Sequence, residues 1–266
     1  MHVIDRRTFL ADMGRGAFAL AVVGLAACSP AATASPPRSG SPPGSGPSPS
    51  DDPTASATTG APPSGTPPSG DAISWERVNL GFVSAYILAR GGEATVVDTG
   101  VGGSADDIEA ALAAVGSDWS GVGHLILTHR HDDHVGSATE ILERAPDAMG
   151  YAGAEDIPAI TVPRPLNPVE DGDRVFDLQI VTAPGHTAGR ICVFDPMAGI
   201  LVAGDALRTD GGRPAPPGAQ FTDDMDEALR SIAKLGGLTF ETLLVGHGEP
   251  IETGASTAVA ELAARQ

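Results

Sequence analysis

Cysteine, aromatic side chains, positive charge and long apolar runs are all scarce in this 266-residue sequence. The two cysteines are too few for a disulfide-rich scaffold or a zinc site built from thiolates. No apolar run reaches the roughly 18 residues that a membrane-spanning helix needs. A formal net charge of −18 repels phosphate backbones and anionic lipid headgroups, so we expect no nucleic-acid partner. Hydrophobic residues still make up 41% of the chain, which is enough for a sizeable core.

Residues 1–27 have the pattern of an export signal. Three arginines precede an apolar stretch, residues 16–27, which has the length of a signal h-region. Residues 5–10 (DRRTFL) resemble a twin-arginine export signal, and residues 25–28 (LAAC) resemble the lipoprotein box, in which Cys28 is lipidated. The alternatives are a cleaved secretory signal and an uncleaved anchor. The lipoprotein signal and both alternatives place the rest of the protein outside the cytoplasm. As a lipoprotein, it is expected to be anchored to the bacterial cell membrane through Cys28.

Residues 28–70 consist almost entirely of Pro, Ser, Gly, Ala and Thr. A segment without aromatic or large aliphatic side chains cannot bury enough apolar area to offset its ordering entropy, so we expect a disordered tether. Acidic and basic residues balance before residue 71, so all of the excess negative charge falls in residues 71–266. That segment has the size of one domain, which we expect to be the catalytic domain.

Apolar, β-rich runs alternate with helical patterns in residues 71–266, which is typical of a layered α/β fold. Helices are expected over residues 105–115, 135–144, 222–235 and 256–264, with Ser104 and Thr222 as the N-caps of the first and third. Five apolar runs end in a histidine or an aspartate, which are Asp98, His129, His186, Asp205 and His247. Strands of one sheet that end alike place such residues at one edge, where ligands usually bind.

The densest group of chemically active residues is the segment 128–134, which reads THRHDDH. Its three imidazoles and a carboxylate are ligand types that zinc and comparable divalent ions prefer. The alternative is a solvated acidic loop with incidental histidines. Four adjacent ligands cannot all reach one ion without strain, so the spacing predicts two ions that share the cluster.

Four motifs resemble, in order and spacing, those of the metallo-β-lactamase-fold hydrolases. They are His129-x-His131-x-Asp133-His134, Gly185-His186-Thr187, Ala203-Gly204-Asp205 and Gly246-His247-Gly248. The resemblance implies an α/β fold, a four-layer αββα sandwich, with a dinuclear metal site at one edge. It implies a first ion held by His129, His131 and His186, and a second held by Asp133, His134 and His247. Asp205 is implied to bridge the two ions, and Asp98 to support the ligands.

The resemblance also implies the activity: hydrolysis of a small-molecule ester, thioester, lactone or amide by a metal-bound hydroxide. Asp133 would orient the nucleophile or accept its proton, and the two divalent ions are expected to be zinc, with iron or manganese as alternatives. An aspartate at position 205, where the zinc β-lactamases carry Cys or Ser, is closer to the glyoxalase II-like and lactonase-like branch. The alternatives are a β-lactamase, a persulfide (sulfur) dioxygenase with one iron, and an inactive metal-binding scaffold.

A few residues outside the motifs also carry expectations. We expect Arg190 in a surface ion pair, with contact to a substrate carboxylate as the alternative. Structural positions are expected for three residues: Tyr86, His124 and Cys192. Two interpretations, a rim around the substrate site and ordinary packing, stay open for three features: Trp75, Phe82 and the loop 213–221.

Overall fold

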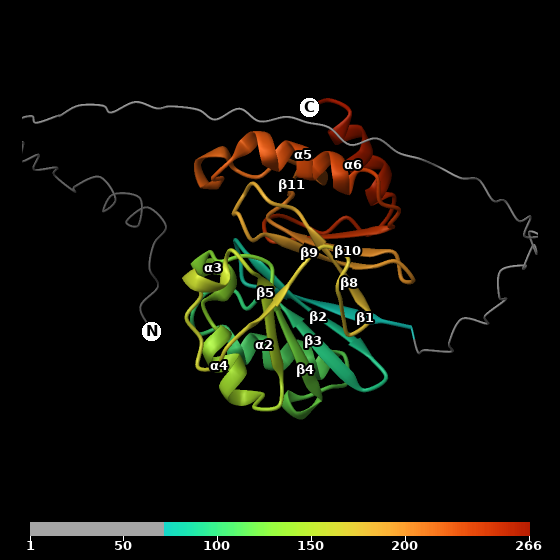
Figure 1. The fold of residues 1–266 in the computed structure, drawn as a ribbon. Helices are drawn as coiled ribbons and strands as arrows, with labels where there is room; N and C mark the ends of the chain where they lie inside the picture. Colours follow the sequence, from blue (N-terminus) through green and yellow to red (C-terminus); the bar gives the residue numbers. More distant parts are fainter. Residues whose placement is uncertain (1–71) are drawn as a thin grey trace, which may run out of the picture. The chain divides into compact units, whose positions relative to one another are not determined.

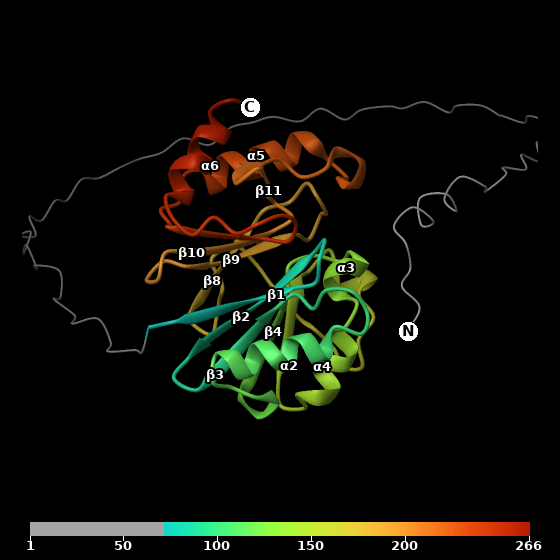
Figure 2. The same ribbon diagram turned by 180° about the vertical axis from the view of Figure 1, so that it is seen from behind.

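The computed structural model describes residues 72–266 (Figure 1), so the expected export signal, Cys28 and the tether lie outside the described residues. The described part forms two facing sheets with helices on the outer side of each, as Figures 1 and 2 show from opposite directions. The predicted four-layer αββα sandwich is confirmed. No helix within the described range is both long and apolar enough to cross a membrane.

The first sheet has six strands, which are in spatial order β1 (Ser74–Asn79), β2 (Ser84–Arg90), β3 (Glu93–Val97), β4 (Val122–Leu127), β5 (Met149–Gly153) and β6 (Asn167–Val169). The pairs from β1 to β3 are antiparallel, whereas those from β3 to β6 are parallel. Its outer face packs against α2 (Ala105–Ala114) and α4 (Ala138–Arg144). The short helix α3 (Asp132–Val135) follows β4 and carries part of the histidine motif.

The second sheet has five strands, which are in spatial order β13 (Thr242–Val245), β10 (Ile200–Gly204), β9 (Ile191–Asp195), β8 (Leu178–Thr182) and β7 (Arg174–Val175). Only β10 and β13 pair in parallel. Helices α5 (Met225–Leu235) and α6 (Ala255–Ala263) cover its outer face. The smaller elements are the hairpin β11 (Arg208–Asp210) and β12 (Arg213–Ala215) and the 3-10 turns η1 (Trp119–Gly121), η2 (Ile157–Ala159) and η3 (Ala219–Phe221).

Both faces of each sheet are buried, because alternate side chains of a strand serve different layers. In β2, Ile87 packs among the helices, whereas Tyr86 and Leu88 face the second sheet. Both faces therefore need apolar residues, which explains the continuous apolar runs of the sequence. The Tyr86 hydroxyl donates to the Val245 carbonyl across the two sheets, at 2.8 Å. Cys192 is fully buried in β9, so the structural positions expected for Tyr86 and Cys192 are confirmed.

Two expected helix boundaries and one expected side-chain cap are wrong, and local hydrogen bonds explain each difference. The helix expected over 135–144 is divided into α3 and α4, because the backbone N–H of Gly136 donates to the Gly100 carbonyl instead of continuing one helix. The Ser104 hydroxyl donates to the Val101 carbonyl at 2.8 Å and does not cap α2. Helix α5 begins at Met225, where the carboxylate of Asp224 accepts from the Glu227 N–H.

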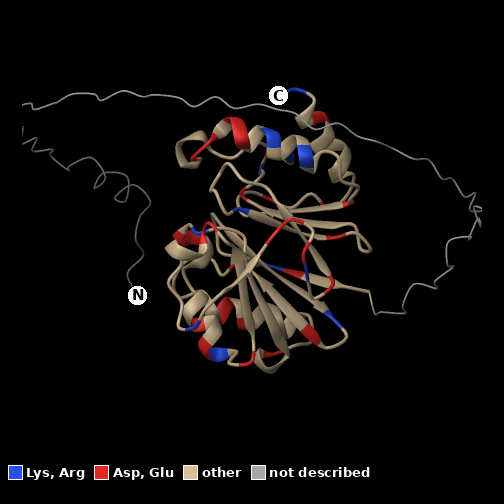
Figure 3. Ribbon diagram, in the orientation of Figure 1, with Lys and Arg blue, Asp and Glu red and all other residues tan. Residues whose placement is uncertain are grey.

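Acidic residues occur on the helices and loops of both halves of the described domain, as Figure 3 shows. Basic side chains are fewer, in keeping with the net charge of −18. A field of this sign attracts cations and repels polyanions.

Candidate metal centre

The histidines and aspartates at the strand ends meet at one edge of the sandwich. Asp98 directly follows β3, and His129 follows β4 after a single residue. Asp205 directly follows β10, and His247 follows β13 after a single residue. Because β3 runs parallel to β4 and β10 runs parallel to β13, their carboxyl ends lie side by side. His186 joins them from the loop that follows β8.

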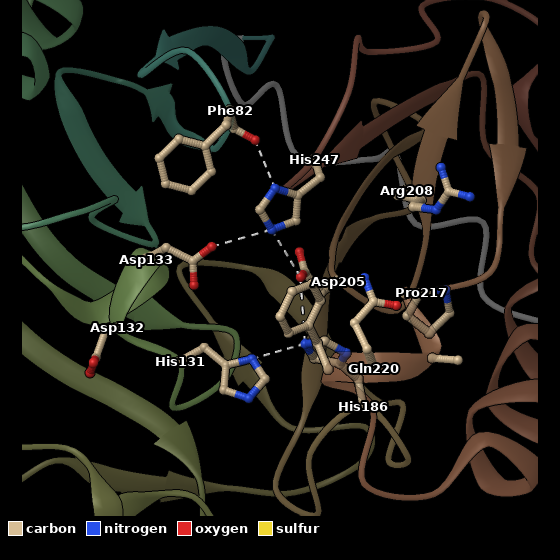
Figure 4. Close-up of a pocket in the computed structure, with 13 residues that line it drawn as sticks. Phe82, His131, Asp132, Asp133, His186, Asp205, Arg208, Pro217, Gln220 and His247 are labelled. Carbon is tan, nitrogen blue, oxygen red and sulfur yellow. Dashed lines mark hydrogen bonds and ion pairs between the residues drawn. The ribbon is translucent and has the colours of Figure 1, made fainter. Parts of the chain in front are cut away.

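The structure brings all seven expected ligands together in three overlapping groups, within each of which the ligand atoms lie no more than 4.8 Å apart. The groups are His129, His131 and His186; His129, His134 and Asp205; and Asp133, His134 and His247. We call the first and the third of these the two outer groups. Asp205 lies between them, because its Oδ2 is 3.5 Å from His186 Nε2 and 3.1 Å from His247 Nε2 (Figure 4).

The nitrogen and oxygen atoms of the candidate ligands are better placed to bind divalent ions than to form hydrogen bonds with one another. His134 Nε2 and Asp205 Oδ1 are buried and lie 3.3 Å apart, and neither forms a hydrogen bond in the described part of the chain. Leaving a buried polar atom unpaired costs about 1–3 kcal/mol. His131 Nδ1 lies 3.1 Å from His129 Nε2 and 3.0 Å from His186 Nε2, so three imidazole nitrogens converge on one point. Imidazole and carboxylate groups are ligands for zinc, iron and manganese, and the cluster is able to hold such ions.

Neighbouring groups fix the outer nitrogen of four histidines. His134 Nδ1 donates to Asp98 Oδ2 at 2.8 Å, and His247 Nδ1 donates to the Phe82 carbonyl at 2.7 Å. His186 Nδ1 donates to the Thr222 hydroxyl at 3.2 Å, and His129 Nδ1 donates to the Thr128 hydroxyl at 3.1 Å. These tautomers, assigned from the partners, leave the Nε2 of each imidazole, in its neutral form, as an acceptor that faces the cluster. Support of this kind orients histidines for metal binding.

Asp98 is the centre of that support. Its φ of +62° is uncommon for a residue other than glycine. Its carboxylate accepts from the backbone N–H and the hydroxyl of Thr128, each at 2.7 Å, and from His134. Asp98 therefore orients His134 by a direct hydrogen bond and orients His129 through the hydroxyl of Thr128.

Asp156, which the sequence analysis missed, fastens two of the histidine-bearing loops to each other. The side chain is fully buried. It accepts from the N–H of Arg130 at 3.1 Å, from the Thr187 hydroxyl at 2.5 Å and from the N–H of Gly189 at 2.9 Å. The loops that carry His131 and His186 are thereby held in register. Neither motif nor spacing in the sequence marks this aspartate, and only the tertiary structure reveals its role.

The expectation of a surface ion pair for Arg190 is wrong. The side chain is 1% exposed, and its Nη2 donates to the Ala203 carbonyl. It forms no ion pair within the described residues, and it does not line the cavity. A Cβ on Gly204 would lie 3.0 Å from Nη2, so the glycine provides the space for the guanidinium. His124 lies away from the cluster, where its Nε2 is 3.1 Å from a carboxylate oxygen of Glu93, as a structural histidine would be.

A cavity of about 810 Å³ opens over the cluster (Figure 4). Its walls include Phe82, Arg208 and residues 217–221, while five of the candidate ligands form its floor. Phe82 and Phe221 are 62% and 64% exposed, so two aromatic rings stand at the opening. Of the expected rim, Phe82 and the end of the loop line the cavity, whereas Trp75 packs against the core beside Tyr86.

The two outer groups differ in charge. Burial lowers the pKa of His129 and His131, and it lowers that of His186 to about 3. Burial alone would also lower the pKa of His134, but the carboxylates of Asp205 and Asp98 raise it to about 10. Hydrogen bonds to Asp133 and Asp205 raise the pKa of His247 to about 10 as well. At neutral pH and without bound ions, His134 and His247 are therefore doubly protonated and positively charged, whereas His129, His131 and His186 are neutral.

Loading the protein with zinc at pH 7 is expected to release about two protons per chain from His134 and His247. Each of these two imidazoles must lose the proton on Nε2 before that nitrogen binds an ion, whereas His186 is already neutral at pH 7. Because the pKa values of His134 and His247 are both raised, protons compete with the metal ion at both ligands. The zinc affinity of the group Asp133, His134 and His247 is therefore expected to fall by about a hundredfold for each pH unit below about pH 10. Calorimetry in buffers of different ionisation enthalpy measures the release. Ionisation of a water at the site adds at most about one proton, so a total of about one or fewer contradicts the prediction.

Comparisons with known proteins agree with this geometry. The family model described as the metallo-beta-lactamase superfamily matches residues 78–247, which is more than half of the chain. YflN of Bacillus subtilis (strain 168), named a probable metallo-hydrolase, is 34% identical over 171 residues that cover 48% of this chain and 64% of YflN. The chain thus spans just under two thirds of the length of that relative.

Two solved structures share the fold. The metallo-beta-lactamase family protein TTHA1429 from Thermus thermophilus superposes with a TM-score of 0.58 at 23% identity, covering 73% of this chain and 79% of TTHA1429. TTHA1623, solved in a di-iron-bound form, superposes with a TM-score of 0.54 at 26% identity, covering 69% and 92% of the two chains.

Proposed function

The chain belongs to the metallo-beta-lactamase superfamily as a metallo-hydrolase, and from this premise we propose that it is a dinuclear hydrolase of small-molecule esters, thioesters, lactones or amides. The observation that carries the proposal is the presence of two three-residue groups with a shared aspartate between them. In this proposal one ion would be held by His129, His131 and His186, and the other by Asp133, His134 and His247. Asp205 lies close to ligands of both groups and would serve both.

Divalent ions at such a site supply Lewis-acid chemistry, which activates water and polarises carbonyl oxygens. The protein's own contribution to proton transfer is assigned to Asp133. This half-buried carboxylate lies on the cavity floor with one oxygen 3.3 Å from His247 Nε2 (Figure 4). The hydrogen bond with His247 holds the pKa of Asp133 below its usual range, so the carboxylate is ionised at neutral pH. It is therefore placed to orient an attacking water and to accept its proton.

The cavity walls support a substrate with an apolar part and an anionic group. Phe82 and Phe221 offer apolar surface at the opening. Arg208 is the single Arg or Lys among the residues described as lining the cavity, and it is half-buried with its Nε donating to the Pro216 carbonyl. Its Nη1 also lies 3.6 Å from Oδ2 of the exposed Asp210, so the guanidinium is suited to bind a substrate carboxylate through Nη2. We therefore propose that the preferred substrate carries a carboxylate near the scissile carbonyl.

Iron is the second candidate for the metal, and the di-iron form of TTHA1623 is the observation that favours it. Asp205 supports a two-ion site with either metal, because its carboxylate lies within 3.5 Å of His186 in one group and of His134 and His247 in the other. The persulfide dioxygenase alternative needs a single iron, which any one of the three groups would hold on its own.

Elemental analysis of the purified protein, combined with a substrate panel, tests the proposal. We expect about two ions per chain, a loss of metal in His131→Ala, and turnover of at least one ester, thioester or lactone substrate. Each carboxylate substrate is compared with its methyl ester, and the carboxylate form is expected to be turned over more efficiently. A β-lactam as the best substrate identifies a β-lactamase, and one iron with oxygen uptake identifies a dioxygenase. A folded protein that takes up no ion even when zinc, iron and manganese are supplied contradicts the metallo-hydrolase assignment.

A further inference from the structure

Arg190 carries a buried positive charge that the proposed reaction does not use. It is the largest of the fully buried side chains in the described part of the chain. Its Nη2 donates to the Ala203 carbonyl, while its Nε is buried with no hydrogen-bond partner among residues 72–266. No carboxylate of that range lies within ion-pair distance of it. An unpaired charge in a protein interior is costly, so its presence calls for an explanation.

The guanidinium lies directly behind the candidate ligands. Its Nη1 is 3.3 Å from His129 Nδ1, although that nitrogen already donates to the Thr128 hydroxyl. In the tautomer assigned above two N–H groups face each other there, and in either tautomer a neutral imidazole leaves the charge of the arginine uncompensated. On its other side, the guanidinium contacts the backbone of Ala203 and Gly204, immediately before Asp205. One fixed charge thus lies beside a ligand of the first group and beside the strand end that carries the shared aspartate.

We propose that Arg190 is a positioning residue that sets the metal affinity of the cluster, weakening the hold on divalent ions through charge repulsion. Repulsion between like charges is strong in an interior that excludes water. Arginine suits this role because it stays charged when buried, whereas lysine loses its proton readily. The same charge favours anionic groups at the cluster. The inference rests on the proposed function, because it takes the histidine and aspartate cluster to hold ions.

The test compares zinc affinity between the full-length wild type and two neutral variants, Arg190→Met and Arg190→Gln, by competition with a chromophoric chelator. Removing the charge removes its repulsion of the ions, so we expect binding to become tighter by about tenfold or more. A merely structural role would make binding weaker, so the direction separates the two roles. Circular dichroism and thermal melting report whether each variant folds.

Arg164→Met is the matched control. Arg164 is half-buried and, like Arg190, donates to backbone carbonyls, which are those of Ala145 and Ala148. It contacts none of the candidate ligands, so its zinc affinity is expected to equal that of the wild type.

The outcomes separate this inference from the proposed function. A wild type that binds no zinc overturns the metal site itself. A wild type that binds two ions, together with neutral variants that bind zinc equally or more weakly, overturns the role of Arg190 and leaves the metal site in place. If Arg190→Met does not fold, Arg190→Gln decides. If neither variant folds, Arg190 is required for the fold and the inference is overturned.

Discussion

Asp205→Asn is expected to reduce the metal content from about two ions to at most one and to lower kcat/KM by about a thousandfold or more. The carboxylate is buried and lies 3.3 Å from His134 Nε2, 3.5 Å from His186 Nε2 and 3.1 Å from His247 Nε2. An amide of the same size keeps the packing but removes the negative charge that both outer groups share. A metal ion contributes several kcal/mol of transition-state stabilisation, and about 4 kcal/mol corresponds to about a thousandfold in rate.

Asp195→Asn is the control for this variant. Asp195 is also buried at a strand end of the second sheet, but it pairs with Arg90 and caps a turn. Its loss is expected to cost stability while leaving the metal content at the wild-type value. Elemental analysis and thermal melting on both variants separate the two effects. An Asp205→Asn protein that keeps two ions and more than about a tenth of the activity contradicts the shared position assigned to Asp205.

The positions of three candidate ligands, His129, Asp205 and His247, could be predicted from the sequence because each follows an apolar strand directly or after one residue. Strands on the inside of a layered fold need apolar residues on both faces, so the change to His129 or Asp205 is abrupt and marks the strand end. Parallel pairing then requires those ends to share one edge. The layer architecture follows from the same alternation of strands and helices. These features are local in the sequence, which makes them readable without the structure.

The missed features depend on contacts between distant segments. The space for Arg190 exists because Gly204, on a neighbouring strand, has no side chain. The support for His186 comes from Thr222, which the sequence suggested as a helix cap. Asp156 acts through loops that come together only after folding. In each case the side chain has an unremarkable local sequence, and its role follows from which segments the sheets place next to it.

The adjacent residues Asp132 and Asp133 allow a closely matched comparison, in which only Asp133→Asn is expected to abolish most of the activity. Both lie in the first turn of α3 and both line the cavity. Asp133 Oδ2 is 3.3 Å from His247 Nε2, whereas Asp132 is exposed and forms no ion pair within the described range. Loss of a group that transfers a proton lowers the rate by about 10²–10⁴-fold. Asp132→Asn is a surface change, so we expect its kcat to remain within roughly a factor of two of the wild type.

Measurements at saturating zinc separate the two contributions of Asp133, because the amide is expected to weaken zinc binding as well as proton transfer. With the site filled, a lower kcat reports the proton-transfer role, and the zinc concentration needed for half-maximal activity reports the ligand role. If saturating zinc restores Asp133→Asn to more than about a tenth of the wild-type kcat, Asp133 is a ligand and not the proton acceptor. An equal loss in Asp132→Asn would show instead that the negative charge of the α3 start, shared by both residues, is what the reaction needs.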